Sequence, residues 1–114
     1  LILYFFGLRK TAIVCGYSML PTLKKSDIVF FKKYNKGKSL LEVGQIVIFY
    51  HPLKDIKLIK RIKSVKNNSI EVFGDNIGFS DDSSKFGFIN NEKVIGIVTS
   101  RLFNLRFKTF LTNK

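Results

Sequence analysis

The sequence of 114 residues has no Trp, one Cys, one His and two Pro, and it is poor in acidic residues. A single Cys excludes a disulfide within the chain, and one Cys with one His cannot form a zinc site of the Cys/His type. The chain has 20 Lys and Arg against 8 Asp and Glu, a formal net charge of +12. Such an excess favours anionic partners such as nucleic acid, a membrane surface or an acidic protein. Because the Lys residues are spread along the chain, the charge predicts weak attraction to anions and not a sequence-reading site.

Long hydrophobic runs are also missing. A membrane-spanning helix needs roughly 20 apolar residues, whereas the apolar N-terminal segment, residues 1–10, is uncharged only as far as Leu8. No basic region precedes it and no small-residue cleavage site follows, so we do not expect a secretory signal. The segment is expected to be a core strand or a stretch resting on a membrane. The chain opens on Leu, so an upstream segment would change the membrane prediction.

The length suits one domain with a modest core, and we expect residues 1–114 to form it. Short runs of β-branched and aromatic residues alternate with turn signals, and no long amphipathic helix pattern is present. Strands are expected over residues 11–17, 26–33, 45–50, 57–65, 69–73 and 93–101. Loops or turns are expected at 34–39, Asn67-Asn68 and 77–86, a bulge at Gly96, and a short helix or frayed basic tail over 102–114. This pattern predicts an all-β fold, a small barrel or folded sheet.

Residues 16–23 read Gly-Tyr-Ser-Met-Leu-Pro-Thr-Leu. Pro21 fixes its own φ, lacks an N–H and disfavours a helical residue before it. We therefore expect Ser18 at the end of a strand, on a stiff turn, with its hydroxyl and backbone N–H available. This position suits a nucleophile, and it equally suits an ordinary turn, where Ser and Pro are common. Cys15, just before this stretch, is expected to be a small buried hydrophobe.

Lys60 lies in the expected strand 57–65, where side chains alternate between two faces. Leu58 and Ile62 share its face, and most of the charge falls on the other one, so Lys60 is expected to point toward the core. Full burial can lower the pKa of a Lys from about 10.4 by about 3 to 5 units. A fall of roughly 3 units costs the fold about 4 kcal/mol at 1.36 kcal/mol per unit. An unprotonated Lys within reach of a Ser hydroxyl would activate that hydroxyl as a nucleophile, whereas a Lys that snorkels to solvent would not.

A third polar stretch follows the strand 69–73. Gly74-Asp75-Asn76 is expected to be a tight turn, and Ser80 and Asp82 come soon after it. A hydroxyl in this loop could hold Lys60 in line with Ser18, and Asp82 could fix the loop by accepting hydrogen bonds. A solvated Ser/Asp loop would have the same composition.

Together and in this order, these stretches resemble the signal peptidase I family of serine proteases, which use a Ser-Lys dyad. The matching motifs are Ser18 to Leu23, Lys60-Arg61-Ile62, and Gly74-Asp75-Asn76 with Ser80 and Asp82. The resemblance implies a signal-peptidase-like folded sheet or barrel, with Ser18 as nucleophile and Lys60 as general base. It also implies that Ser80 orients Lys60 and that Asp82, Gly74, Asp75 and Asn76 structure the loop. The oxyanion would be held by the backbone N–H of Ser18, with help from around Gly16, and neither a metal nor a cofactor is implied.

Within this family the chain is most similar to the small maturation proteases of nickel-type superoxide dismutase. The shared features are its short length, His51-Pro52-Leu53 and the stretch 95–101. This similarity implies a cytoplasmic protease whose partner is a protein substrate, the superoxide dismutase precursor, from which it removes the N-terminal leader.

The sequence departs from the family pattern in places. Gly16 offers no hydroxyl to the oxyanion, Ser26 stands where Gly is usual before Asp27, and Gln45 stands where Asp often follows Gly44.

Two other functions stay open. One is a signal peptidase peripheral at the membrane, where residues 1–8 and the basic surface would contact anionic lipid and secretory leaders would be cleaved. The other is a basic β-barrel that binds single-stranded nucleic acid through Phe and Lys.

Overall fold

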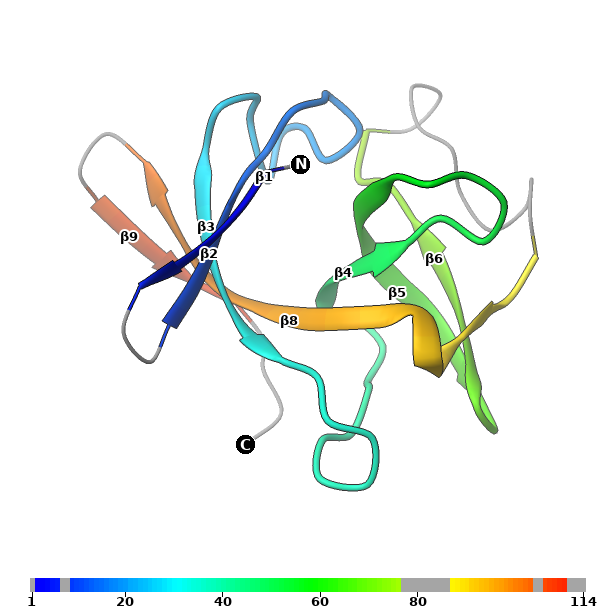
Figure 1. Cartoon of the computed structure of the whole chain (residues 1–114). Coiled ribbons are helices and arrows are strands. Elements are labelled where there is room, and N and C mark those ends of the chain that lie inside the picture. Colours follow the sequence, from blue (N-terminus) through cyan, green and yellow to red (C-terminus); the bar gives the residue numbers. More distant parts are fainter. Residues whose placement is uncertain (1, 7–8, 77–86, 104–105, 111–114) are drawn as a thin grey trace.

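The computed structural model describes residues 2–6, 9–76, 87–103 and 106–110. In these residues nine strands pair antiparallel in one sheet that curls into a half-barrel (Figure 1). No α-helix occurs in the described ranges, so the all-β prediction is confirmed. The strands are β1 Ile2–Phe6, β2 Arg9–Ile13, β3 Ile28–Lys33, β4 Ile46–Tyr50, β5 Lys57–Lys66, β6 Ser69–Phe73, β7 Ile89–Asn90, β8 Val94–Phe103 and β9 Arg106–Thr109, with one 3-10 turn, η1, at Asn91–Lys93.

The strand order is β1-β2-β3-β8-β4-β5-β6-β7, and β9 also pairs with β8. The long β8 therefore joins two groups of strands, β1 to β3 on one side and β4 to β7 on the other (Figure 1). Where β8 pairs with β4, Val94 and Gly96 have partners on β4 and Ile95 between them has none, so the pairing is irregular next to Gly96. A Cβ at Gly96 would collide with the ring of Phe31 and lie 2.8 Å from the carbonyl oxygen of Lys32. The expected irregularity at Gly96 therefore has a packing reason, the close approach of β3.

Two buried apolar clusters fill the curl of the sheet, and β4 separates them. Ile46 and Ile48 belong to one cluster, while Val47 and Phe49 belong to the other. This alternation follows from the two-residue period of a strand, here with both faces buried. The first cluster also contains Met19 and Leu23 from the turn around Ser18, together with Ile59 of β5. The core therefore anchors that turn beside β5.

Several predicted boundaries were wrong. The strand expected over 11–17 ends at Ile13, so Ser18 lies in a turn stretch and not at a strand end. The tail expected from residue 102 includes the strand β9, and the short β7 was not predicted. The hairpin turn at Asn67-Asn68 is confirmed, although neither Asn has a positive φ. Residues 77–86, expected to be a loop, lie outside the described residues.

Of the two expectations for the N-terminal segment, the strand is observed as β1, which pairs with β2. In the ranges that the structure covers, no helix has the length and apolar character that a bilayer crossing demands.

Two turns with one hydrogen-bond pattern lead into β3 and β4. In the first, the N–H of Asp27 donates to the Lys24 carbonyl at 3.0 Å, and the Lys24 N–H donates to Asp27 Oδ2 at 2.8 Å. The same carboxylate oxygen accepts from Arg101 Nη1 at 3.0 Å, in a buried ion pair. Ser26, the third residue of this turn, has φ 73°, a left-handed conformation that only glycine adopts without cost.

The second turn repeats this pattern at residues 42–45. The Gln45 N–H donates to the Glu42 carbonyl at 3.2 Å, and the Glu42 N–H donates to Gln45 Oε1 at 2.9 Å. Its third residue is Gly44, with φ 94°. Gln45 is fully buried and takes the place that Asp27 has in the first turn.

The Ser26→Gly variant is expected to unfold at higher denaturant, with a free energy of unfolding greater by about 0.5–1 kcal/mol. Glycine removes the left-handed strain, part of which is offset by the greater freedom of the unfolded chain. Ser26 is exposed, so no buried contact is lost. Urea unfolding followed by circular dichroism measures the change. The matched control, Gly44→Ala, should lose about 1 kcal/mol or more, and a Ser26→Gly protein less stable than wild type would contradict this account.

Candidate active site

The turn that carries Ser18 is held by hydrogen bonds within the turn and by two of its side chains that are buried in the core. The Leu20 N–H donates to the Tyr17 carbonyl at 3.2 Å, and the Leu23 N–H donates to the Met19 carbonyl at 2.8 Å. Met19 and Leu23 are almost fully buried in the first apolar cluster. Ser18, directly before Met19, is half-buried. It therefore lies in a turn that is held by hydrogen bonds and by buried side chains.

A hollow of about 310 Å³ opens beside Ser18. Its lining residues are Cys15, Gly16 and Ser18 from the Ser18 turn, Ile56 just before β5, and Lys57, Leu58 and Ile59 at the start of β5. A Cβ built at Gly16 would meet nothing within 4 Å, so the missing side chain there leaves room over the hollow and is not demanded by packing. The volume is at the lower end for a ligand site and suits small side chains of a bound peptide.

Cys15 is exposed, and the prediction that it is a buried hydrophobe is wrong. The reason is that β2 ends at Ile13, so the in-and-out alternation of a strand does not reach Cys15. Its Sγ instead donates to the Ile13 carbonyl at 3.6 Å, and the side chain lines the hollow next to Ser18.

Lys60 is buried, with 3% of its surface exposed. It pairs with Val47 of β4, and its strand neighbours on the same face, Leu58 and Ile62, pack with the second apolar cluster. Ile59 on the opposite face is buried in the first cluster, so both faces of β5 are covered at its middle. The sequence predicted that only the face of Lys60 would be buried. The ammonium therefore does not snorkel to solvent, and Leu58, on its face, also lines the hollow with Ser18.

Arg61 and Asp75 join the strand of Lys60 to the turn of Ser18. Nε and Nη2 of Arg61 donate to the two carboxylate oxygens of Asp75 at 2.9 and 2.8 Å, a bidentate pair. Nη1 of Arg61 donates to the Gly44 carbonyl at 2.7 Å, and the Thr22 hydroxyl donates to Asp75 Oδ2. The turn is thus clamped to β5 through side chains from all three motifs.

The clamp also shifts the ionisation of both charged groups. Burial by itself would raise the pKa of Asp75, but the hydrogen bonds from Arg61 and Thr22 and the charge of Arg61 outweigh it, so the pKa is lowered. The hydrogen bond to Asp75 raises the pKa of Arg61, against the opposing effect of burial. Asp75 is therefore held as a carboxylate and Arg61 as a cation.

Asn76 completes the attachment of the Ser18 turn. Its backbone N–H donates to the Ser18 carbonyl at 2.8 Å, and its Nδ2 donates to the Tyr17 carbonyl at 2.9 Å. Asp75 and Asn76 thus hold the turn of Ser18 through hydrogen bonds with Thr22, Tyr17 and Ser18. The oxyanion and loop-structuring roles that the resemblance implies stay predictions.

Two predicted site residues, Ser80 and Asp82, lie outside the described residues. The roles that the resemblance implies for them stay predictions. The sequence also did not single out Thr22 or Arg61 as functional, although both stand inside recognised motifs. The signal that could have identified them is their place in the chain, since Thr22 follows Pro21 and Arg61 follows Lys60.

A family model described as signal peptidase, peptidase S26, matches residues 1–71. The matched range contains Ser18 and Lys60 and ends before Gly74-Asp75-Asn76. Among curated proteins, none matches the chain.

The Asp75→Asn variant is expected to lose about 1–3 kcal/mol of unfolding free energy at pH 7, because it leaves Arg61 without its carboxylate. The folded pKa of Asp75 lies below its unfolded value, so its contribution is present above about pH 4 and is lost as the pH falls through the folded pKa. The difference between wild type and variant should therefore shrink on acidification, measured by urea unfolding from pH 7 to pH 2.5. Asp55→Asn, at an exposed loop position, is the control. A difference that does not change with pH would contradict the ion-pair account.

Proposed function

We propose that this chain, which belongs to the signal peptidase family, peptidase S26, cleaves peptide bonds with a dyad of Ser18 and Lys60. As a member it is a signal-peptidase-like serine protease. The observation that carries the dyad is the burial of Lys60 on a strand that is clamped to the Ser18 turn. Lys is rarely buried to this extent, and a Ser-Lys dyad requires an amine that is shielded from water.

In the proposed reaction the amine of Lys60 takes the proton of the Ser18 hydroxyl, and Ser18 Oγ attacks the scissile carbonyl carbon. The oxyanion of the tetrahedral intermediate accepts a hydrogen bond from the Ser18 N–H. The leaving amine takes the proton from Lys60, and an acyl-enzyme ester remains on Ser18. Lys60 then accepts a proton from water, which attacks the ester and frees Ser18. An ammonium cannot accept the first proton, so activity should fall toward acid pH.

Other roles in this site are proposed from the family resemblance. Ser80 would hold the Lys60 amine in line with Ser18 through its hydroxyl, and Asp82 would structure the loop that carries it. The clamp of Asp75 and Asn76 on the Ser18 turn supports such a loop position, because both residues precede that loop directly in the chain.

The substrate we propose is the precursor of a nickel-type superoxide dismutase, from which the protease removes the N-terminal leader in the cytoplasm. The resemblance of this chain to maturation proteases of that kind supports it. The metal would belong to the substrate, and the dyad chemistry itself requires none.

One observation favours a second candidate, a peptidase that works at a membrane surface. Leu53 and Ile56, in the loop between β4 and β5, are exposed, and Ile56 lines the hollow at Ser18. The neighbouring Lys54 and Lys57 would meet anionic headgroups there. Co-sedimentation with phosphatidylglycerol vesicles, beside the Leu53→Ser variant, separates the two candidates.

The dyad is tested by incubating the superoxide dismutase precursor with wild type, Ser18→Ala and Lys60→Met, and by reading the new N-terminus by mass spectrometry. Each variant should lose at least about 10³-fold in rate, because the nucleophile or its base is gone. Lys60→Met keeps the length and apolar character of the buried stem, and Lys63→Met, at an exposed position of β5 outside the hollow, is the matched control. Processing by Lys60→Met at the wild-type rate would remove Lys60 from the mechanism. A wild type that cleaves secretory leaders and spares the precursor would overturn the proposed substrate.

Alkylation of Cys15 tests whether the hollow at Ser18 receives the substrate. Cys15 is the single cysteine of the chain and is exposed, so N-ethylmaleimide modifies one site. The added ring would occupy the hollow, and cleavage should fall at least 10-fold, or about 1.4 kcal/mol in barrier height. The Cys15→Ala protein should cleave normally and resist the reagent. Full activity of the alkylated wild type would show that the substrate does not use this hollow.

A further inference from the structure

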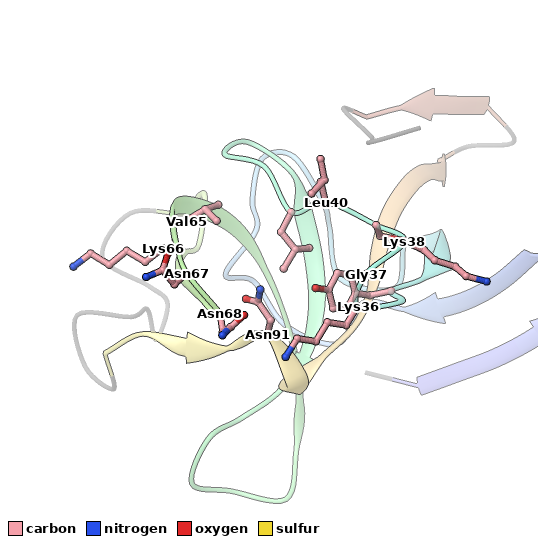
Figure 2. Close-up of a pocket in the computed structure, with 12 residues that line it drawn as sticks. Lys36, Gly37, Lys38, Leu40, Val65, Lys66, Asn67, Asn68 and Asn91 are labelled. Atoms are coloured by element: carbon pink, nitrogen blue, oxygen red, sulfur yellow. The ribbon is translucent and has the colours of Figure 1, made fainter.

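A second hollow, of about 450 Å³, lies at the far end of β5. Its walls are the loop 34–41, the turn between β5 and β6, and Asn91 of η1 (Figure 2). In Figure 1 this loop lies at the opposite end of the sheet from the Ser18 turn. Ile59 lines the hollow at Ser18 and Val65 lines this one, so about 20 Å of β5 separate them at about 3.3 Å per residue.

The rim of this hollow is basic. Lys36, Lys38 and Lys66 line it, and no acidic residue does. Within the described ranges none of these three lysines forms an ion pair, while Lys66 Nζ lies over the Phe88 ring at 5.0 Å. Figure 2 shows Lys66 and Lys38 reaching away from the hollow on different sides. Charges spread round a rim fit an extended ligand with several anionic groups better than one small anion.

The floor of the hollow is polar. The backbone N–H of Asn91 donates to the Asn68 carbonyl at 2.8 Å, which fixes η1 to the hairpin turn. The side-chain Oδ1 of Asn91 is buried and has no hydrogen-bond partner in the described part of the chain. A buried acceptor without a donor is costly, and rotation of the Asn91 side chain toward the hollow would let a ligand N–H satisfy it. Leu40 and Val65 add exposed apolar surface at the edge.

We infer that this hollow is an exosite that binds an acidic stretch of the polypeptide substrate, an inference that rests on the proposed proteolytic function. An acidic peptide supplies carboxylates for the lysines, backbone N–H groups for Asn91, and side-chain stems for Leu40. A phosphate dianion is too small to meet lysines that reach out on different sides of the hollow, and a flat lipid surface does not fill a hollow. An extended chain that reaches from Ser18 to this site needs at least about six residues.

Binding is measured with the intact Ser18→Ala protein and a fluorescein-labelled 12-residue peptide of Glu, Asp, Gly and Ser, by anisotropy. The double variant Lys36→Glu/Lys66→Glu should weaken binding at least 10-fold. Lys25→Glu/Lys54→Glu changes the net charge equally at exposed positions outside the hollow and should stay within about twofold. Equal weakening by both doubles would overturn the exosite in favour of diffuse attraction. Inorganic phosphate and phosphatidylserine vesicles are titrated in parallel, and Lys36/Lys66-dependent binding of either one without the peptide would also overturn it.

A cleavage assay separates failure of the exosite from failure of the proposed function. One leader peptide is prepared with and without an acidic segment at least six residues from the scissile bond. With an active Ser18, wild type should show a lower KM for the acidic form at unchanged kcat, and Lys36→Glu/Lys66→Glu should lose only that difference. Cleavage of both peptides with equal KM would overturn the exosite and leave the protease intact. Binding of the acidic peptide without cleavage of either would instead overturn the proposed function.

Discussion

The ion pair between Arg61 and Asp75 is the interaction on which the site depends. Arg61 stands next to Lys60 on β5, and Asp75 stands next to Asn76, which holds the carbonyls of the Ser18 turn. Thr22 closes the connection by donating to the same carboxylate. A planar guanidinium that meets both carboxylate oxygens fixes orientation as well as distance, which a Lys at this position would not do. One side-chain pair therefore sets how the turn of Ser18 lies against the strand of Lys60.

Lys60 lies on the same strand and is buried, and apolar clusters cover both faces of β5. Burial of a charged side chain is costly unless hydrogen bonds or an opposite charge compensate it. Arg61, the next residue, pairs with Asp75 through Nε and Nη2 and donates from Nη1 to the Gly44 carbonyl. The two adjacent basic residues differ in their surroundings because a strand directs consecutive side chains to opposite faces. Arg61 is held by a carboxylate, and Lys60 is buried.

Much of this could be predicted from sequence, because alternation and turn residues act locally. The two-residue period gave the strands β3 to β6 within two residues, and it put Lys60 with Leu58 and Ile62. What could not be predicted depends on distant partners. Ile59 is buried by Met19 and Leu23, some forty residues earlier, so its face looked solvent-exposed. Cys15 was misjudged because nothing local shows that β2 ends at Ile13, and β9 is a strand only through pairing with β8.

The matched turns show how two of the departures from the family pattern, Ser26 and Gln45, fit into the fold. In the turn 24–27, the Val14 N–H donates to the Asp27 carbonyl, and the Val14 carbonyl accepts from the Ser26 N–H. In the turn 42–45, Ile62 forms the same two backbone hydrogen bonds with Gln45 and Gly44. Ser26 and Gln45 are the unusual residues, and both sit in these turns. Gln45 Oε1 accepts the N–H of Glu42, just as Asp27 Oδ2 accepts the N–H of Lys24 in the first turn. Ser26 keeps the left-handed backbone at an energetic cost. Both departures therefore act on the stability of the turns that lead into β3 and β4.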